Sequence, residues 1–79
     1  MQIELYGVLK EAAGTDTLEI PAPEGGTVAA ALDQLAASHP ALAKHLERAA
    51  AAVGDQLVNR NAPVDDATRL VLLPPVSGG

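Results

Sequence analysis

Hydrophobic and polar residues alternate in two short stretches near the start of the chain, and alternation with a period of two is typical of a half-buried β-strand. Residues 2–6 place Ile3 and Leu5 on one face and more polar side chains on the other. Residues 15–20 alternate in the same way. The two early stretches are separated by a short connection, in which residues 10–14 have the pattern of a helical turn that ends in glycine. This arrangement predicts a hairpin at the start of the chain.

A helical repeat follows the Pro- and Gly-rich loop of residues 21–26. Thr27 is the predicted N-cap, because its hydroxyl can accept a hydrogen bond from a free amide of the first turn. The apolar residues that follow recur at the spacing of one helix face. They are Val28, Ala31, Leu32, Leu35 and Ala36. We expect Pro40 to end this helix. We expect a short second helix over residues 41–48, with Leu42 and Leu46 as its apolar residues.

The second half of the chain predicts further strands. Residues 50–53 and 56–58 flank Gly54 and Asp55, which indicates two short strands about a tight turn. The strand of residues 69–73 is stopped by Pro74, because proline has no amide hydrogen to donate to a sheet. The order strand, strand, helix, then two or three strands predicts an α+β domain with a mixed sheet and one main helix on one face. The β-grasp is the small fold with this order. We therefore expect a domain over residues 1–73 and a flexible, extended tail over residues 74–79.

The last strand carries more apolar side chains than one buried face needs. If Leu70 and Leu72 face the core, then Val71 and Leu73 face outward. Tyr6 is also outward on the first strand, so Tyr6 and Leu73 are candidates for an exposed apolar patch if the two strands are neighbours. Such a patch beside a free tail is a reasonable docking surface. Scattered surface hydrophobes, which are normal in proteins, explain the pattern equally well at this stage.

The tail itself has the features of a reactive terminus. Pro74 and Pro75 favour an extended path, and residues 74–79 can reach roughly 20 Å. Gly78 and Gly79 lack a Cβ, so the tail fits a narrow channel and its last carbonyl can be approached from either face. ATP can convert the terminal carboxylate into an acyl-adenylate, and sulfur can then displace AMP to leave a thiocarboxylate. None of these steps needs a side chain of this protein. A terminal Gly-Gly alone is weak evidence, because most chain ends are simply ragged.

The composition of the chain argues against several classes of function. A chain of 79 residues has room for one small domain. Cysteine is absent, which excludes disulfides and cysteine nucleophiles. The net charge is −5, Lys and Arg are scattered, and Tyr6 is the only aromatic, so nucleic-acid binding has poor support. A leader and a long apolar run are both lacking, so we expect a cytoplasmic protein with no membrane segment.

Other motifs favour structural roles. His39 and His45 lack an evident third ligand, so a metal pair is improbable. The Asp65–Asp66 pair has too few neighbouring ligands for a calcium loop and favours a turn. The segment 25–27 precedes a helix but lacks the lysine and the spacing of a phosphate-binding loop. We therefore expect no bound metal and no bound cofactor.

The chain resembles a known family over essentially its whole length. Residues 3–6 and 10–14 look like that family's first strand and following turn, and residues 27–28 look like its helix start. Residues 52–53, 57–58, 63–66 and 69–73 follow its second half. The most specific piece is the end of the chain, residues 73–79, which reads Leu-Pro-Pro-Val-Ser-Gly-Gly. The family is the MoaD-type small subunit of molybdopterin synthase, within the ubiquitin-like sulfur carriers (the MoaD/ThiS family).

The resemblance implies a β-grasp fold and a division of labour between chains. An E1-like adenylating enzyme of the MoeB type would use ATP to adenylate Gly79, next to Gly78, and a sulfur donor would convert it to a thiocarboxylate. The tail would enter the MoaE-type large subunit, where sulfur passes to a pterin precursor in molybdenum cofactor biosynthesis. This chain would donate sulfur without an active site of its own. The implied partner-binding residues are Tyr6, Leu57, Leu73, Pro74, Pro75, Val76 and Ser77.

Other functions share the same tail. Archaeal-type ubiquitin-like modifiers can end in the same way and be joined to lysines. A sulfur carrier for tRNA thiolation or thiamine is a variant of the first reading, although the Pro-Pro-Val-Ser segment leans away from the thiamine type. A plain interaction module with an idle tail is the third reading. The motif alone does not separate sulfur carriage from conjugation.

Overall fold

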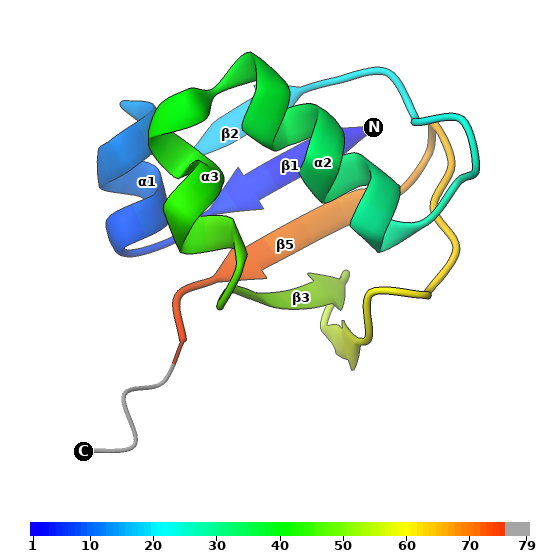
Figure 1. Ribbon diagram of the computed structural model, residues 1–79. Coiled ribbons are helices and arrows are strands. Elements are labelled where there is room, and N and C mark those ends of the chain that lie inside the picture. Colours follow the sequence, from blue (N-terminus) through cyan, green and yellow to red (C-terminus); the bar gives the residue numbers. More distant parts are fainter. Residues whose placement is uncertain (76–79) are drawn as a thin grey trace.

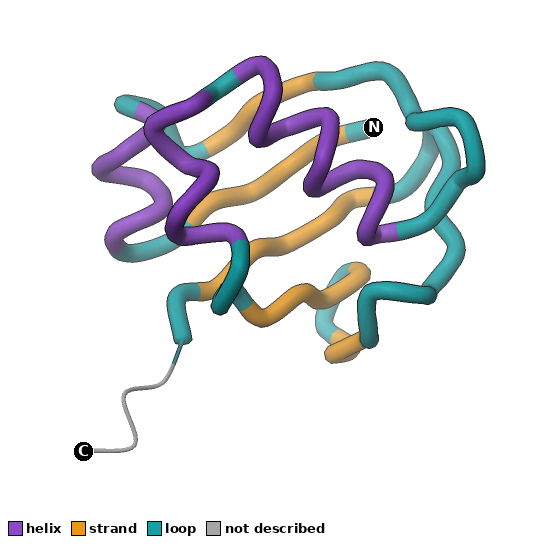
Figure 2. The backbone as a smooth tube through the Cα atoms, viewed as in Figure 1, coloured by secondary structure: helices purple, strands orange, loops and turns teal. Residues whose placement is uncertain are grey.

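The computed structural model describes residues 1–75, in which a mixed β-sheet is covered on one face by helices (Figure 1; Figure 2). The strands are β1 (Gln2–Leu5), β2 (Thr17–Glu19), β3 (Ala50–Val53), β4 (Gln56–Val58) and β5 (Arg69–Leu73). The helices are α1 (Val8–Ala13), α2 (Val28–Ser38) and α3 (Pro40–Leu46).

The strand order is β2-β1-β5-β3-β4. β1 and β5 are parallel, with Ile3 opposite Leu70 and Leu5 opposite Leu72, and the other neighbouring strands are antiparallel. The first and the last strand, β1 and β5, are therefore neighbours inside the sheet. α2 packs on the face of the sheet that the helices cover (Figure 1). The predicted β-grasp fold is confirmed, and so is the early hairpin of β1 and β2.

Local signals explain where the helices start and stop. The Thr27 hydroxyl accepts a hydrogen bond from the Ala30 amide at 3.2 Å, as expected of an N-cap. α2 ends at Ser38, and Pro40 opens α3 rather than merely ending α2. Proline is favoured at a first helical position, because its fixed φ suits the helix and its missing amide hydrogen is not needed there. α1 begins at Val8, earlier than the predicted turn of residues 10–14, and Gly14 caps it with φ 75°.

The core is aliphatic, as the near absence of aromatic residues requires. Leu70 and Leu72 are fully buried, as predicted from the alternation of the last strand. The largest fully buried side chains come from β1, β5 and all three helices. They are Val28, Ile3, Leu5, Leu9, Leu35, Leu42, Leu70 and Leu72. This core fixes β1 and β5 side by side, and so fixes where the tail leaves the domain.

Candidate functional site

The face of the sheet opposite the helices has an apolar centre. Glu4 pairs with Val71, Val71 with Ala52, and Ala52 with Leu57, across four neighbouring strands. These positions alternate with the core positions, so their side chains point away from the helices. We call this surface the open face. Its apolar residues are Tyr6, Ala50, Ala52, Leu57, Val71 and Leu73.

Two of the predicted docking residues are well exposed on the open face. Tyr6 is 48% exposed and Leu57 is 70% exposed. Tyr6 lies beside the end of β5, because the preceding Leu5 pairs with Leu72. Leu57 reaches the same face from the edge strand β4 through its pairing with Ala52. The structure therefore brings Tyr6, Leu57 and Leu73 to one surface, and their role in docking stays a prediction.

Val71 and Leu73 face away from the core, as predicted, but neither side chain is freely exposed. Val71 is buried, with 8% of its surface accessible, and Leu73 is half-buried. The reason is that β5 lies between β1 and β3 in the sheet. Side chains of both neighbouring strands therefore cover the outward-facing side chains of β5. Leu73 in particular lies opposite Ala50 of β3. These two residues form the floor of the apolar surface, whereas Tyr6 and Leu57 project from it.

The far end of the open face is polar. The Arg69 guanidinium lies 3.8 Å from the Glu4 carboxylate. Both side chains retain access to water, so this pair contributes only about 0–1 kcal/mol to stability. Its main effect is to place charged groups near Arg69, the first residue of β5. The apolar surface instead extends from the middle of the sheet to the end from which the tail departs.

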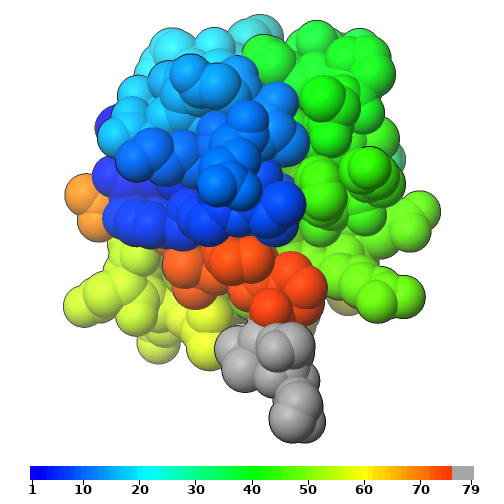
Figure 3. Space-filling view, turned by 90° about the vertical axis from the view of Figure 1, so that its left-hand side faces the viewer, coloured from blue at the N-terminus to red at the C-terminus, as the bar shows by residue number. Residues whose placement is uncertain are grey.

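The root of the tail is held against the turn between β1 and α1. Gly7 has φ 58° and ψ −132°, a backbone conformation that L-residues rarely adopt. A Cβ built on Gly7 would lie only 2.8 Å from Cγ of Pro74. Gly7 therefore permits both the turn and the close approach of the proline ring. Figure 3 shows the red surface of the segment that ends at Pro75 directly beside the dark blue surface of the first residues of the chain.

The structure places only part of the predicted tail site. Pro74 is half-buried and Pro75 is exposed. The predicted partner-binding residues Val76 and Ser77, and the predicted acyl-transfer residues Gly78 and Gly79, lie outside the described residues. Gly7 was missed by sequence reasoning. The only signal was a glycine directly after an alternating strand, and its contact with Pro74 joins positions far apart in the chain.

The remaining motifs have structural roles. Within residues 1–75, no cluster of three or more His, Cys, Asp and Glu side chains is arranged to hold a metal ion. An Asp65 carboxylate oxygen accepts hydrogen bonds from the Ala67 amide at 2.9 Å and the Thr68 hydroxyl at 3.2 Å, which confirms the predicted turn. None of the helices in the described part has the length and apolar character that a membrane span requires.

Comparison with known proteins decides the family. The sequence pattern described as the ThiS family matches residues 3–79. The chain belongs to the ThiS family. The chain is also similar to the small archaeal modifier protein 1 of Haloferax volcanii. The two are 37% identical over the whole of both chains. The crystal structure of SAMP1 from Haloferax volcanii has a TM-score of 0.78 at 28% identity, covering 100% of this chain and 98% of that one.

Two further similarities involve proteins named for molybdopterin synthesis. The molybdopterin synthase sulfur carrier subunit of Arabidopsis thaliana is 27% identical, covering 100% of this chain and 82% of that protein. A structure from Helicobacter pylori 26695, a complex of subunits 1 and 2 of molybdopterin-converting factor, matches with a TM-score of 0.68 and 28% identity. It covers 99% of this chain and 96% of the matched chain. The recognised resemblance to the MoaD/ThiS type is confirmed, and its relatives include proteins named as carriers and as modifiers.

Proposed function

We propose that this ThiS-family chain is the sulfur carrier subunit of a molybdopterin synthase. Its working group is the carboxylate of Gly79, which an E1-like enzyme of the MoeB type activates with ATP. The single observation that supports the proposal is the position of the tail root, Pro74. The root is fixed by the Pro74–Gly7 contact at the apolar end of the open face, beside Tyr6. A partner that binds this surface lies directly beside the root of the tail.

The chemistry follows from the weakness of a carboxylate as an acyl donor. A Gly79 oxygen attacks the α-phosphorus of ATP, pyrophosphate leaves, and a mixed acyl-phosphate anhydride forms. A sulfur nucleophile then attacks the acyl carbon and displaces AMP, which yields the thiocarboxylate. In a MoaE-type large subunit, that sulfur is passed to a pterin precursor. The carrier contributes reach, an unhindered terminus and a docking surface, while ATP and the pterin bind to its partners.

The open face suits such a partner physically. An exposed Leu57 and a half-exposed Tyr6 over an apolar floor form the kind of surface that a protein partner buries. Recognition by base stacking would need several aromatic rings, and the chain has one. The structure from Helicobacter pylori, in which a similar chain is complexed with subunit 2, supports a synthase partner. We place this chemistry in the cytoplasm, where the sequence led us to expect the protein.

A ubiquitin-like modifier joined to lysines is the second candidate. The specific observation that favours it is the 37% identity to the small archaeal modifier protein 1. Both functions begin with the same adenylation of Gly79 and diverge at the acceptor, which is sulfur in one case and a lysine amine in the other. The open face and the tail root serve either function. Carriers for tRNA thiolation or thiamine share the first steps as well.

Truncation tests whether the tail is the working site. A variant that lacks Gly78 and Gly79 is expected to lose all sulfur transfer in a reconstituted molybdopterin synthesis, while its urea unfolding matches the wild type. A second variant, with one alanine appended after Gly79, keeps every native residue but moves the carboxylate, and it is also expected to be inactive. Full activity of the truncated variant would refute the proposal.

The acceptor is decided by a separate experiment. Tryptic digests of the proteome from cells that express this protein can be searched for lysines carrying residues 70–79 as a remnant, because Arg69 is the last tryptic site of the chain. Cells expressing the truncated variant are the control. Remnants found only with the full chain would establish conjugation. Their absence, together with molybdopterin formation in the reconstituted system, would leave sulfur carriage as the function.

A further inference from the structure

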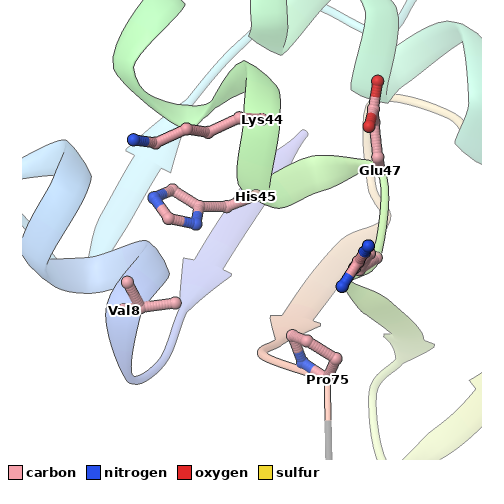
Figure 4. Close-up of a pocket in the computed structure, with 6 residues that line it drawn as sticks. Val8, Lys44, His45, Glu47 and Pro75 are labelled. Carbon is pink, nitrogen blue, oxygen red and sulfur yellow. The ribbon is translucent and has the colours of Figure 1, made fainter.

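A groove of about 400 Å³ opens beside the tail root, on the helical side of the molecule, apart from the open face. It lies where α1 and α3 meet the start of the tail. Its lining residues are Val8, Lys44, His45, Glu47, Arg48 and Pro75. Figure 4 shows Lys44 and His45 extending from α3 toward α1 above Val8, with Pro75 below and Glu47 directed away from them. The groove thus combines two apolar walls with two cations, Lys44 and Arg48, and one carboxylate, Glu47, which is directed away from Lys44 and His45.

The positive charge of this groove contrasts with the rest of the chain. The protein has five Lys and Arg against ten Asp and Glu. Arg60 is used inside the fold, since its guanidinium donates to the carbonyl of Leu46 at 2.8 Å and to that of Ala49 at 3.2 Å. Arg69 faces Glu4 on the open face. Two of the remaining three cations, Lys44 and Arg48, line the groove.

Lys44 and Arg48 have no internal role in the described part of the chain. Within residues 1–75, no hydrogen bond or ion pair engages either side chain. Cations near a helix C-terminus often stabilise its free carbonyls, but at α3 that task belongs to Arg60, which bonds the carbonyls of Leu46 and Glu47. Lys44 and Arg48 are therefore available to a partner.

We propose that this groove is a second docking site, and that its occupant is an acidic segment of the enzyme that activates the tail. Carboxylates of the segment would meet Lys44 and Arg48 on the rim, and an apolar residue between them would lie on Val8 and Pro75. Charge complementarity supports this occupant, and so does continuity, because Pro75 belongs both to the groove and to the tail. A partner held at the open face and at the groove would grip the tail root from two sides.

The inference rests on the proposed function only in naming the partner, so it is tested first without that enzyme. A capped hexaglutamate peptide can be titrated at low salt into the full chain labelled with ¹⁵N. Saturable shifts confined to Val8, Lys44, His45 and Arg48 are expected, and they should be lost in the Lys44→Gln/Arg48→Gln variant. Shifts spread over the surface, or shifts that survive in the variant, would overturn the inference.

The second arm measures the association rate with the E1-like enzyme. At low ionic strength the groove variant should associate about tenfold more slowly than the wild type, and the gap should close as salt is added. Asn61→Asp/Ala67→Glu is the matched control, because it lowers the net charge equally. Both substituted residues are exposed and lie in the connection between β4 and β5, and neither lines the groove. Equal slowing by both variants would show a net-charge effect and overturn the inference.

One further variant separates this occupant from the chain's own terminus. If the carboxylate of Gly79 occupied the groove, deleting residues 76–79 would strengthen binding of the hexaglutamate peptide. An unchanged peptide affinity is the expected result, and a clear gain would overturn the inference. Failure of adenylation in wild-type protein would instead count against the proposed function, since the peptide titration does not depend on it.

Discussion

Substituting Gly7 by alanine tests whether the tail root is held in place by the turn beneath it. Two costs arise at this position. The backbone conformation, φ 58° and ψ −132°, is strained for any residue with a Cβ and costs about 1–3 kcal/mol. The new methyl group also lies 2.8 Å from Cγ of Pro74. Because that carbon belongs to a ring rather than to a flexible side chain, either Pro74 or the turn must move.

Gly14 and Pro74 supply the controls that separate these costs. Gly14 has φ 75°, but a Cβ there meets nothing within 4 Å. Gly14→Ala is therefore expected to cost only the backbone penalty, about 1–2 kcal/mol. In the Pro74→Ala background the clash at Gly7 is gone, so Gly7→Ala should cost less than it does in the wild type. The expected coupling between the two positions is about 0.5–3 kcal/mol.

Urea unfolding of the four members of this cycle gives the coupling energy, and the rate of adenylation by an E1-like enzyme gives its functional consequence. Gly7→Ala should slow adenylation more than Gly14→Ala does, because only the former redirects the tail. Additive effects of Gly7→Ala and Pro74→Ala on stability, together with equal adenylation rates for the two glycine variants, would refute the idea that Gly7 positions the tail.

Three other predictions concern the docking surface and the helix ends. Leu57→Asp should leave the unfolding free energy within about 0.5 kcal/mol of the wild type, because Leu57 is 70% exposed. It should still weaken binding to the large subunit about tenfold or more by placing a charge in an apolar contact; unchanged affinity would mean that the open face is not the interface. Arg60→Ala should cost about 1.5–3 kcal/mol in urea unfolding, since three carbonyls lose a charged donor. Thr27→Ala should cost about 1 kcal/mol through loss of the Ala30 hydrogen bond, and Thr27→Ser should restore it.

Leu57 is a better probe of the interface than Leu73, because the structure shows Leu57 exposed and Leu73 half-buried. Alternation along the last strand placed Leu73 outward, and it does face away from the core. Alternation does not say how many strands flank a position, however. With β1 and β3 on either side, Leu73 is half-buried, so a charge there would disturb the sheet as well as a contact.

Elements with a local signal were predicted from the sequence. The turn at Gly54–Asp55, the Thr27 cap and the end of β5 before Pro74 each depend on residues close together in the chain. The features that shape the tail root depend on residues far apart. Gly7 comes to lie beside Pro74, and Lys44 comes to line the same groove as Pro75, only after β1 and β5 have paired. Leu57 was found through family resemblance alone, because two adjacent apolar residues in a three-residue strand, Leu57 and Val58, do not show which of them faces the core.

The measurement that most directly tests the central claim is the intact mass of the protein after incubation with an E1-like enzyme, ATP and a sulfur source. We predict a mass increase equal to the exchange of one oxygen for one sulfur, localised by fragmentation to Gly79. The variant lacking Gly78 and Gly79 should show no change in the same mixture. An unmodified wild-type protein, in a reaction that converts a known carrier, would contradict the account and leave the fold without the tail as its working site.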